Sequence, residues 1–215
     1  MASISAELDS KGRDPERSKA AILSAARDEF AGHGLAGARI DRIAARAELN
    51  KRLIYYYFKS KDDLFLAVLE HVYAEIRGAE QRLHLLDMEP TEAVRRLIEF
   101  TWNYFIEHPE FITLLASANL HQARHLQRSS RVQEMNSPVI QTLGDVLERG
   151  RKSGVFRGGV DPVQLYISIA GIAYFYLSNK HTLSAIFGRD LMSPKARAER
   201  LGHMCDVILG YVLRS

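Results

Sequence analysis

The chain has 215 residues, of which 47% are hydrophobic and 26% charged, a composition typical of a soluble globular protein that excludes a disordered or fibrous one. The formal charge of +3 is unevenly distributed: residues 1–61 carry 12 Lys and Arg against 8 Asp and Glu, whereas residues 62–215 carry 17 against 18. Cys205 is the only cysteine, which excludes an intrachain disulfide and a C-x-x-C metal or redox site and favours a reducing cytoplasm.

Apolar residues recur at helical spacing along most of the chain, and no segment shows the sustained alternation of a half-buried strand. We therefore predict an all-α protein of about nine helices. The polar start, MASISAELDSKGRDPE, lacks the apolar run of a signal peptide and is expected to be a mobile arm. The longest apolar run, Leu165 to Leu177, is shorter than the roughly 20 residues of a membrane helix, so no membrane span is expected.

Capping and turn residues indicate where these helices begin and end. Asp14, Asn50 and Ser60 can each accept a hydrogen bond from the first turn of a following helix, and Gly32 and Gly34 stop the first helix. In chain order, we expect helices over residues 15–33, 40–47, 51–58, 60–86, 91–108, 109–127, 131–153, 162–179 and 194–213.

The most informative stretch is Ala38 to Lys61, ARIDRIAARAELNKRLIYYYFKSK. It holds two short helices, a connection of about three residues, seven Lys and Arg against two acids, and three consecutive tyrosines. Two short helices joined in this way can cross steeply enough for one to lie in the major groove of DNA while the other braces it. The spacing therefore permits a helix-turn-helix.

The second helix of this pair has an inner and an outer face. Ile54 and Phe58 are four residues apart and are expected to face inward. The residues turned outward are then Lys51, Arg52, Tyr55 and Tyr56. Tyrosine hydroxyls can donate to phosphate, while Arg or Lys side chains can contact guanine. Asn50 can either pair with an adenine edge or only cap the helix, and Lys61 suits a phosphate at the start of the next helix.

Two other interpretations of this stretch remain open. One is a solvated basic face whose tyrosines are half buried against neighbouring helices. The other is a nucleoid-type helical protein that binds DNA without sequence preference. Specific binding would survive competitor DNA, whereas purely electrostatic binding would weaken steeply with salt for every sequence.

At these residues the chain resembles the TetR-like (tetracycline-repressor) family of bacterial transcription regulators. The resemblance covers about residues 18–70 and rests on three segments, AAILSAARDEFAGHGLAGARI, DRIAARAELN and KRLIYYYFKSKDDLFLAVLE. It implies a DNA-binding helix-turn-helix. Carried over by position, it marks as DNA contacts Arg39, Lys51, Arg52, Leu53, Tyr55, Tyr56, Tyr57 and Lys61.

The chain departs from the family pattern at several of these positions. The family often has Thr or Ser at the start of the second helix, where this chain has Ala38 and Arg39, so that helix is expected to lack a hydroxyl cap. Leu53 stands where Thr or another apolar residue is common, and Tyr57 replaces a common His.

Residues 62–215 are net acidic, and their aromatic residues lie on apolar stripes. The resemblance implies an all-helical domain that binds a ligand and dimerises through its last two long helices, residues 162–179 and 194–213. The segment VDPVQLYISIAGIAYFYLS is apolar nearly all round and must be buried on most sides, although an ordinary core helix would also fit. A symmetric dimer would read the two half-sites of a palindromic operator in double-stranded DNA.

A small-molecule site is typically an apolar cavity with a few placed polar groups. The segment FTWNYFIEHPEFITLLASANLHQARH supplies such residues together with tyrosines from other helices, although each can equally belong to the plain core. The candidate ligand contacts are Tyr73, Trp102, Phe105, Phe111, Asn119, His121, Tyr166 and Tyr174. His121, Arg124 and His125 can bind a carboxylate, which favours an aromatic or acidic effector.

His121 and His125 also have the i, i+4 spacing of two zinc ligands, which raises the alternatives of a metallohydrolase and, with His108, a metal-sensing regulator. Catalysis has little support, because Gln122 stands where the hydrolytic motif needs a glutamate as general base. The chain has no Walker loop, nucleophile elbow or glycine fingerprint after a strand. We therefore expect no enzyme, no metal and no cofactor.

Together these features predict a cytoplasmic, ligand-responsive and sequence-specific DNA-binding transcriptional regulator. Residues 1–61 are expected to form the arm and the helix-turn-helix domain, and residues 62–215 the effector-binding and dimerisation domain. Repression is the mode that the resemblance implies, with a homodimer released from its operator by a small-molecule effector. The long helix from Ser60 is the expected lever.

Overall fold

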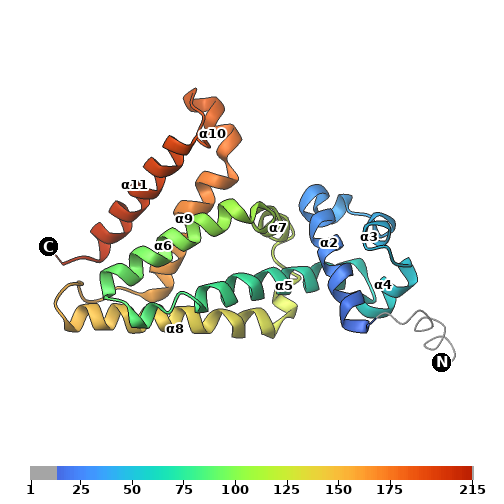
Figure 1. Ribbon diagram of the computed structural model, residues 1–215, viewed down its shortest axis with the longest axis horizontal. Helices are drawn as coiled ribbons and strands as arrows, with labels where there is room; N and C mark the ends of the chain where they lie inside the picture. Colours follow the sequence, from blue (N-terminus) through green and yellow to red (C-terminus); the bar gives the residue numbers. More distant parts are fainter. Residues whose placement is uncertain (1–13, 215) are drawn as a thin grey trace. The chain divides into compact units, whose positions relative to one another are not determined.

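The computed structural model describes residues 14–214 (Figure 1), so the predicted arm over residues 1–13 lies outside the described residues. The described part forms ten α-helices and two short 3₁₀-helices, and its β-structure is one isolated bridge between Phe156 and Leu213. The predicted all-α fold is confirmed. In chain order the helices are α2 (Pro15–Gly37), α3 (Ile40–Arg46), α4 (Lys51–Phe58), α5 (Lys61–Gln81), η1 (Leu85–Asp87), α6 (Pro90–Glu107), α7 (Pro109–Leu120), η2 (Leu126–Arg128), α8 (Ser130–Lys152), α9 (Pro162–Ser178), α10 (Lys180–Phe187) and α11 (Pro194–Val212).

Side-chain caps begin several helices at the residues expected from the sequence. Asp14 accepts a hydrogen bond from the amide two residues on at 3.0 Å, and Asn50 does the same at 2.9 Å. Ser60 accepts from the amide three residues on at 3.0 Å. Each bond satisfies an amide that has no partner within its helix, so the three predicted caps are confirmed.

Helices α5 and α7 end earlier than the apolar spacing predicts. α5 stops at Gln81, the chain turns at His84 with a φ of +50°, and Leu85 is then buried from η1. After the end of α7, Gln122 and Ala123 adopt φ values of +55° and +53°. Apolar residues continue through both turns, so their spacing alone does not mark the end of the helix.

Helix α10 is the helix that the sequence does not predict. The pair Phe187-Gly188 indicates a break between helices, and a helix does end there, but the eight residues that finish at Phe187 are themselves a helix. None of them is buried, and both Ile186 and Phe187 are exposed. A helix without a buried stripe has no apolar period to reveal it.

The described chain divides into two compact units. The first comprises residues 14–73 and 113–130, and the second residues 74–112 and 131–214. The chain therefore passes from one unit to the other three times, within α5, within α7 and at the start of α8. The domain boundary expected after residue 61 stays a prediction.

In the first unit, α2 packs on α3 and α3 packs on α4 (Figure 1, blue to cyan). Gly34, with a φ of +64°, interrupts α2 where the sequence predicts its end. The rings of Phe30 and Phe65 meet edge to face at 5.0 Å. The buried apolar residues of α2 to α5 in this unit are Ile22, Ala25, Ala26, Phe30, Leu35, Ile43, Ala44, Ile54, Leu64, Phe65, Val68, Leu69 and Val72.

In the second unit, α6, α9 and α11 pack on one another, and α10 packs on α9. One face of α9 is buried in this core, through Leu165, Ile169, Ala173 and Leu177. Among the helices of residues 14–214, none is long and apolar enough to cross a membrane.

Candidate nucleic-acid interface

Helix α4 buries one side and exposes the other. Ile54 is fully buried, whereas Tyr55 is 47% and Tyr56 60% exposed. Lys51 and Arg52 are exposed as well. The predicted directions of these five residues are confirmed, whereas Phe58, which the spacing also places inward, is only half-buried. A soluble protein seldom exposes neighbouring aromatic residues without a partner for them.

Leu53, Tyr57 and Phe58 lie half-buried at the border of this exposed face. The Tyr57 ring meets that of Tyr56 edge to face at 5.2 Å, and Lys19 Nζ lies 5.6 Å from its centroid. Tyr57 is therefore held by contacts on α2 and α4, and only part of it is open to a ligand.

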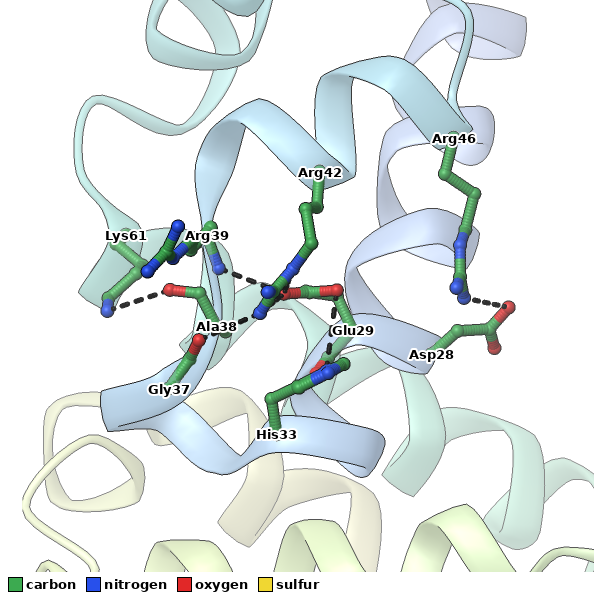
Figure 2. Close-up of polar contacts among 9 residues, drawn as sticks. All are labelled: Asp28, Glu29, His33, Gly37, Ala38, Arg39, Arg42, Arg46 and Lys61. Carbon is green, nitrogen blue, oxygen red and sulfur yellow. Dashed lines mark hydrogen bonds and ion pairs between the residues drawn. The ribbon is translucent and has the colours of Figure 1, made fainter.

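Helix α3 begins at Arg39 without a side-chain cap of its own, as the family departure predicts. Helix α2 satisfies a different amide, that of the N-cap residue itself: Glu29 Oε1 accepts from the Arg39 amide at 3.0 Å and also from Arg42 Nε at 2.6 Å (Figure 2). His33 Nδ1 lies 3.5 Å from Glu29 Oε2. Burial opposes ionisation of Glu29, but the bonds from Arg42 and Arg39 outweigh it and hold the pKa of Glu29 below its usual value.

The three arginines of α3 and its N-cap differ in what they contact (Figure 2). Arg42 Nη2 lies 2.6 Å from Glu29 Oε1 and donates to the Gly37 carbonyl at 2.9 Å. Arg46 Nη1 lies 3.1 Å from Asp28 Oδ2. Within the described residues, the Arg39 guanidinium has no hydrogen bond or ion pair. Arg42 and Arg46 therefore attach α3 to α2, and Arg39 is free to meet an external anion.

Lys61 joins the start of α5 to the corner before α3. Its Nζ donates to the Ala38 carbonyl at 3.2 Å (Figure 2) and to the Ala36 carbonyl at 3.5 Å. Arg39 follows Ala38 in the chain, so two cations flank the same peptide. An ammonium has three donors, which leaves one for a ligand, and the positive end of a long helix also favours an anion there.

The segment between α7 and α8 contacts the first turn of α5. Arg128 Nη2 donates to Asp63 Oδ1 at 2.9 Å, and His125 Nε2 lies 3.5 Å from Asp62 Oδ2. Arg124 Nη2 lies 3.8 Å from the same oxygen of Asp62. Two of the groups expected to bind an effector carboxylate thus already face an acidic residue of the protein, and their role in effector binding stays a prediction.

The predicted DNA contacts lie on α4, at its N-cap, or at the first residues of the helices on either side. Together they offer phenol hydroxyls, two guanidinium groups and ammonium groups, the donors that contact phosphates and base edges. They are Arg39, Asn50, Lys51, Arg52, Leu53, Tyr55, Tyr56, Tyr57 and Lys61. Lys51 is partly occupied, because its Nζ donates to Asp41 at 3.0 Å. Contact of each residue with DNA stays a prediction.

Glu29 is the residue of this interface that sequence reasoning missed. It lies seven residues after Ile22 and three after Ala26, which places a carboxylate on the buried stripe of α2. A charge at such a position needs a buried partner, and the three arginines of the next helix could have supplied the signal.

The predicted ligand contacts divide between the two units. Tyr73, Asn119 and His121 belong to the first unit. Those in the second are Trp102, Phe105, Phe111, Tyr166 and Tyr174. Phe105 and Phe111 are buried and stack on each other at 5.6 Å, while Asn119 is exposed and donates to the Leu115 carbonyl at 3.0 Å. Their role as ligand contacts stays a prediction.

The second unit holds a cavity of about 260 Å³ beside the C-terminal end of α5. Its wall includes Arg77, Glu80, Leu85, Met135, Pro138 and Val139. None of the predicted ligand contacts lines this cavity, although the Tyr166 hydroxyl accepts a hydrogen bond from Arg77. Arg77 and Glu80 lie on the buried side of α5 next to Ile76, a placement that the sequence analysis did not detect.

Across residues 14–214, no group of three or more His, Cys, Asp or Glu side chains is arranged to hold a metal ion. His108 Nδ1 lies 3.1 Å from Glu110 Oε1, and the rings of His121 and His125 are 6.3 Å apart at nearly a right angle. The structure thus offers no donor set for the metal-sensing alternative in this range.

Two family models match the chain. The model described as bacterial regulatory proteins, tetR family, matches residues 22–68, and that of the tetracyclin repressor-like C-terminal domain matches residues 90–208. The HTH-type transcriptional repressor NicS of Pseudomonas putida is 39% identical over 199 residues, which are 93% of this chain and 94% of that protein. The HTH-type transcriptional repressor SCO4008 of Streptomyces coelicolor is 37% identical over 64% of this chain and 69% of that protein.

Solved structures share the fold. The putative transcriptional regulator SCO4942 of Streptomyces coelicolor aligns with a TM-score of 0.67 at 24% identity, covering 92% of this chain and 99% of that one. The ketosteroid transcriptional regulator KstR2 of Mycobacterium tuberculosis aligns with a TM-score of 0.64 at 19% identity, covering 92% and 95%. The chain belongs to the TetR family of bacterial regulatory proteins. It is a DNA-binding transcriptional regulator with an N-terminal helix-turn-helix.

Proposed function

We propose that the protein is a homodimeric repressor that binds a palindromic operator through α4 and its flanks, and leaves it when a small molecule binds the C-terminal helices. The DNA-binding part of this proposal rests on the two faces of α4. The helix buries Ile54 and exposes Arg52, Tyr55 and Tyr56. Residues 1–61 would read DNA, and residues 62–215 would bind the effector and dimerise. The names of NicS and SCO4008, both transcriptional repressors, support repression.

The dimer is supported by an exposed apolar stripe on α9. Val163, Ile167 and Phe175 follow one another at steps of four or eight residues and are all exposed, on the side opposite the buried face. Gly171 lies between them with no heavy atom near its Cβ position. On α11, Val207 and Tyr211 are also exposed at a four-residue step. Two helices per subunit with such faces can form a four-helix interface by symmetric pairing.

A symmetric dimer fits the small size of the DNA-binding helix. α4 has eight residues and can contact only a few base pairs, so two copies are needed for a specific site. Two-fold symmetry of the protein then requires two-fold symmetry of the operator. The distance between the two half-sites is set by the dimer, which gives an effector a means of control.

Release from DNA needs no chemical reaction, so we propose neither a catalytic activity nor a cofactor, and we place the protein in the cytoplasm with its DNA. The effector has only to favour a dimer whose two α4 helices are misplaced for successive major grooves. A hundredfold loss of operator affinity corresponds to a coupling free energy of about 2.7 kcal/mol. Helix α5 belongs to both units, which makes it the natural path for this coupling.

The test is selection of binding sites from a random double-stranded DNA library by the purified full-length protein. We expect an inverted repeat with one dimer bound to each site. A single unrepeated half-site bound by a monomer, or enrichment of no sequence over competitor DNA, would overturn the proposal.

Three variants make this test specific to α4 and its flanks. Arg52→Ala should change the selected sequence at one position in each half-site, because a guanidinium that reads a base discriminates by about 1–3 kcal/mol. Lys61→Ala should weaken binding to all sequences alike and reduce its salt dependence. Arg189→Ala removes an exposed cation of the second unit and is the matched control. If all three behave alike, the interface is assigned wrongly.

A further inference from the structure

Arg77, Glu80 and Tyr166 form a buried polar cluster in the second unit. Arg77 is 5% and Glu80 4% exposed. Arg77 Nη2 donates to the Tyr166 hydroxyl at 2.5 Å, Arg77 Nη1 lies 2.6 Å from Glu80 Oε2, and the Tyr166 hydroxyl donates to Glu80 Oε1 at 3.2 Å. Desolvation offsets most of what a buried ion pair contributes to folding, so stability alone does not account for these charges.

The cluster leaves part of the Arg77 guanidinium without a hydrogen bond. Within the described residues, Arg77 Nε has no acceptor, and the close approach of Nη1 to Glu80 lacks hydrogen-bond geometry. A guanidinium presents five N–H donors and stays charged at any physiological pH. Glu80 Oε2 is likewise left without a hydrogen bond, so the two charged groups are close but imperfectly paired. An anion placed to accept from Nε and Nη1 would satisfy the guanidinium better and would also match its charge.

The cavity of about 260 Å³ adjoins this guanidinium, because Arg77 and Glu80 both line it. Much of the remaining wall is apolar and comes from η1 and α8, through Leu85, Leu86, Met135, Pro138 and Val139. A cavity of roughly 150 Å³ is enough to hold benzene. There is room here for one ring, or a short branched chain, together with a small polar end group.

The counter-ion Glu80 can give way to a second carboxylate. Burial raises the pKa of Glu80 to about 7, although Arg77 and Tyr166 act in the opposite direction. The other titratable groups on the cavity wall are His84 on the turn after α5 and Asp87 on η1, while the α8 residues of the wall carry no charge. An anion arriving at Arg77 would therefore be matched by uptake of one proton on Glu80.

We propose that this cavity binds a small carboxylate with an apolar body, whose carboxylate takes the place of Glu80 on the Arg77 guanidinium. Glu80 accepts one proton from solution in the exchange, so the net charge of the cluster does not change. The inference rests on the proposed function, since it names the chemical class of the effector. Arg77 lies on α5, the helix that begins at Lys61 in the DNA-binding unit.

The test measures binding to the full-length protein without DNA. The probes are benzoate, phenylacetate and hexanoate, each paired with its neutral amide, and binding is followed by isothermal titration calorimetry between about pH 6 and about pH 8. We expect one site per chain and at least one carboxylate that binds about tenfold or more tightly than its amide. Because one proton is taken up, its affinity should fall about tenfold for each pH unit above about 7.

Variants separate the proposed exchange from a merely structural role of the cluster. Glu80→Gln should keep carboxylate binding but lose its dependence on pH. The double variant Arg77→Gln/Glu80→Gln removes both charges together, so no buried charge is left unpaired, and it should bind a carboxylate no better than the amide. Arg82→Gln changes an exposed arginine one turn further along and is the matched control. Thermal melting followed by circular dichroism checks that each variant is folded.

The inference is overturned if no carboxylate binds more tightly than its amide, or if the folded double variant binds carboxylates like the unchanged protein. These outcomes are distinct from failure of the proposed function. A protein that selects a palindromic operator but prefers no carboxylate would disprove the inference alone. A protein that binds carboxylates at Arg77 but shows no specific operator would disprove the proposed function alone.

Discussion

Glu29 lies on α2 but serves the start of α3. Its carboxylate, with 3% of the side chain exposed, accepts bonds from the Arg39 amide and the Arg42 side chain. Removing one partner of a buried charged pair leaves the others unsatisfied. The angle at which α3 leaves α2 therefore depends on this single carboxylate.

Glu29→Gln should lower the free energy of unfolding by about 1–3 kcal/mol at neutral pH, measured by urea unfolding. Because the pKa of Glu29 is held below 4.5, its contribution is complete above about pH 4.5 and is lost as the pH falls through the lowered pKa. The variant and the unchanged protein should therefore converge in acid. Glu16→Gln, at an exposed position of the same helix, should change little, and equal losses in both variants would contradict this assignment.

The raised pKa of Glu80 predicts a dependence of stability on pH opposite to that of Glu29. Its pKa is raised from 4.5 to about 7 by burial, so its contribution to stability is complete below about pH 4.5 and is lost as the pH rises through about 7. Glu80→Gln should flatten the fall in thermal melting temperature between these pH values. A profile identical to that of the unchanged protein would show that Glu80 keeps its ordinary pKa.

Single residues were predictable where a regular period places them. The outward direction of Tyr55 and Tyr56 follows from the four-residue step between Ile54 and Phe58, and the structure agrees. The polar network around Glu29 was not predictable in the same way, because it joins residues of two helices through a corner. Periodicity assigns the faces of one helix at a time, and it does not show which charged residues of different helices pair.

At the scale of elements, the end of α8 is fixed by an unusually close contact. A Cβ at Gly150 would lie 2.1 Å from the Phe156 ring, and the amide of Phe156 donates to the Gly150 carbonyl at 3.0 Å. The adjoining residue Arg157 donates its amide to the Val212 carbonyl at 3.0 Å, which ties this turn to the end of α11.

Gly150→Ala should therefore destabilise the protein by about 1–3 kcal/mol or more, since the Phe156 ring must move out of a packed site. Gly144→Ala, on the same helix, meets only Pro162 Cγ at 3.8 Å and should be neutral or stabilising by up to about 1 kcal/mol, because alanine favours a helix. Both are measured by denaturant unfolding. Equal effects would mean that helix propensity, not packing, decides at these positions.

The exposed apolar stripe of α9 predicts that a charge placed on it disrupts the dimer. Phe175→Asp places a charge at the centre of the proposed dimer interface and should shift the protein from dimer to monomer in sedimentation equilibrium, with a large loss of operator affinity. Leu120→Asp alters an even more exposed apolar residue on α7 and should leave the dimer intact. A Phe175→Asp protein that stays dimeric would place the interface elsewhere.

Most helices were predictable because they carry a cap and a buried stripe, as α2, α4 and α9 do. The errors have two physical causes. At His84 and after α7, residues with positive φ turn the chain where apolar residues keep recurring at helical spacing, and nothing in the residue types reveals the turn. Helix α10 escapes prediction for a different reason, because it has helical geometry but no buried residue.

For the whole molecule, the division into units is not continuous along the chain, since residues 113–130 belong with residues 14–73. Prediction from the sequence assigns each domain to a continuous segment. It could therefore predict a DNA-binding part and an effector part, but not that residues 113–130 belong to the first unit. Three crossings, within α5, within α7 and at the start of α8, offer covalent paths between the units.

Coupling between the units must be reciprocal. If the effector lowers operator affinity a hundredfold, bound operator must lower effector affinity by the same factor, about 2.7 kcal/mol in each direction. Titration of the effector into the free protein and into the protein–operator complex measures both. Equal effector affinity in the two titrations would mean that the effector site and the operator site are not coupled.

The cap of α3 has a consequence for how this regulator can diverge. In a helix-turn-helix whose first residue caps its own helix, that side chain is tied to folding and cannot change freely. Here no side chain makes that bond, and Glu29 instead anchors the start of α3 through the backbone amide of Arg39, which every residue except proline possesses. Within the described residues, the side chain at position 39 makes no hydrogen bond or ion pair, so we expect substitutions there to leave the fold intact. If Arg39 contacts DNA as predicted, the same substitutions should alter operator binding.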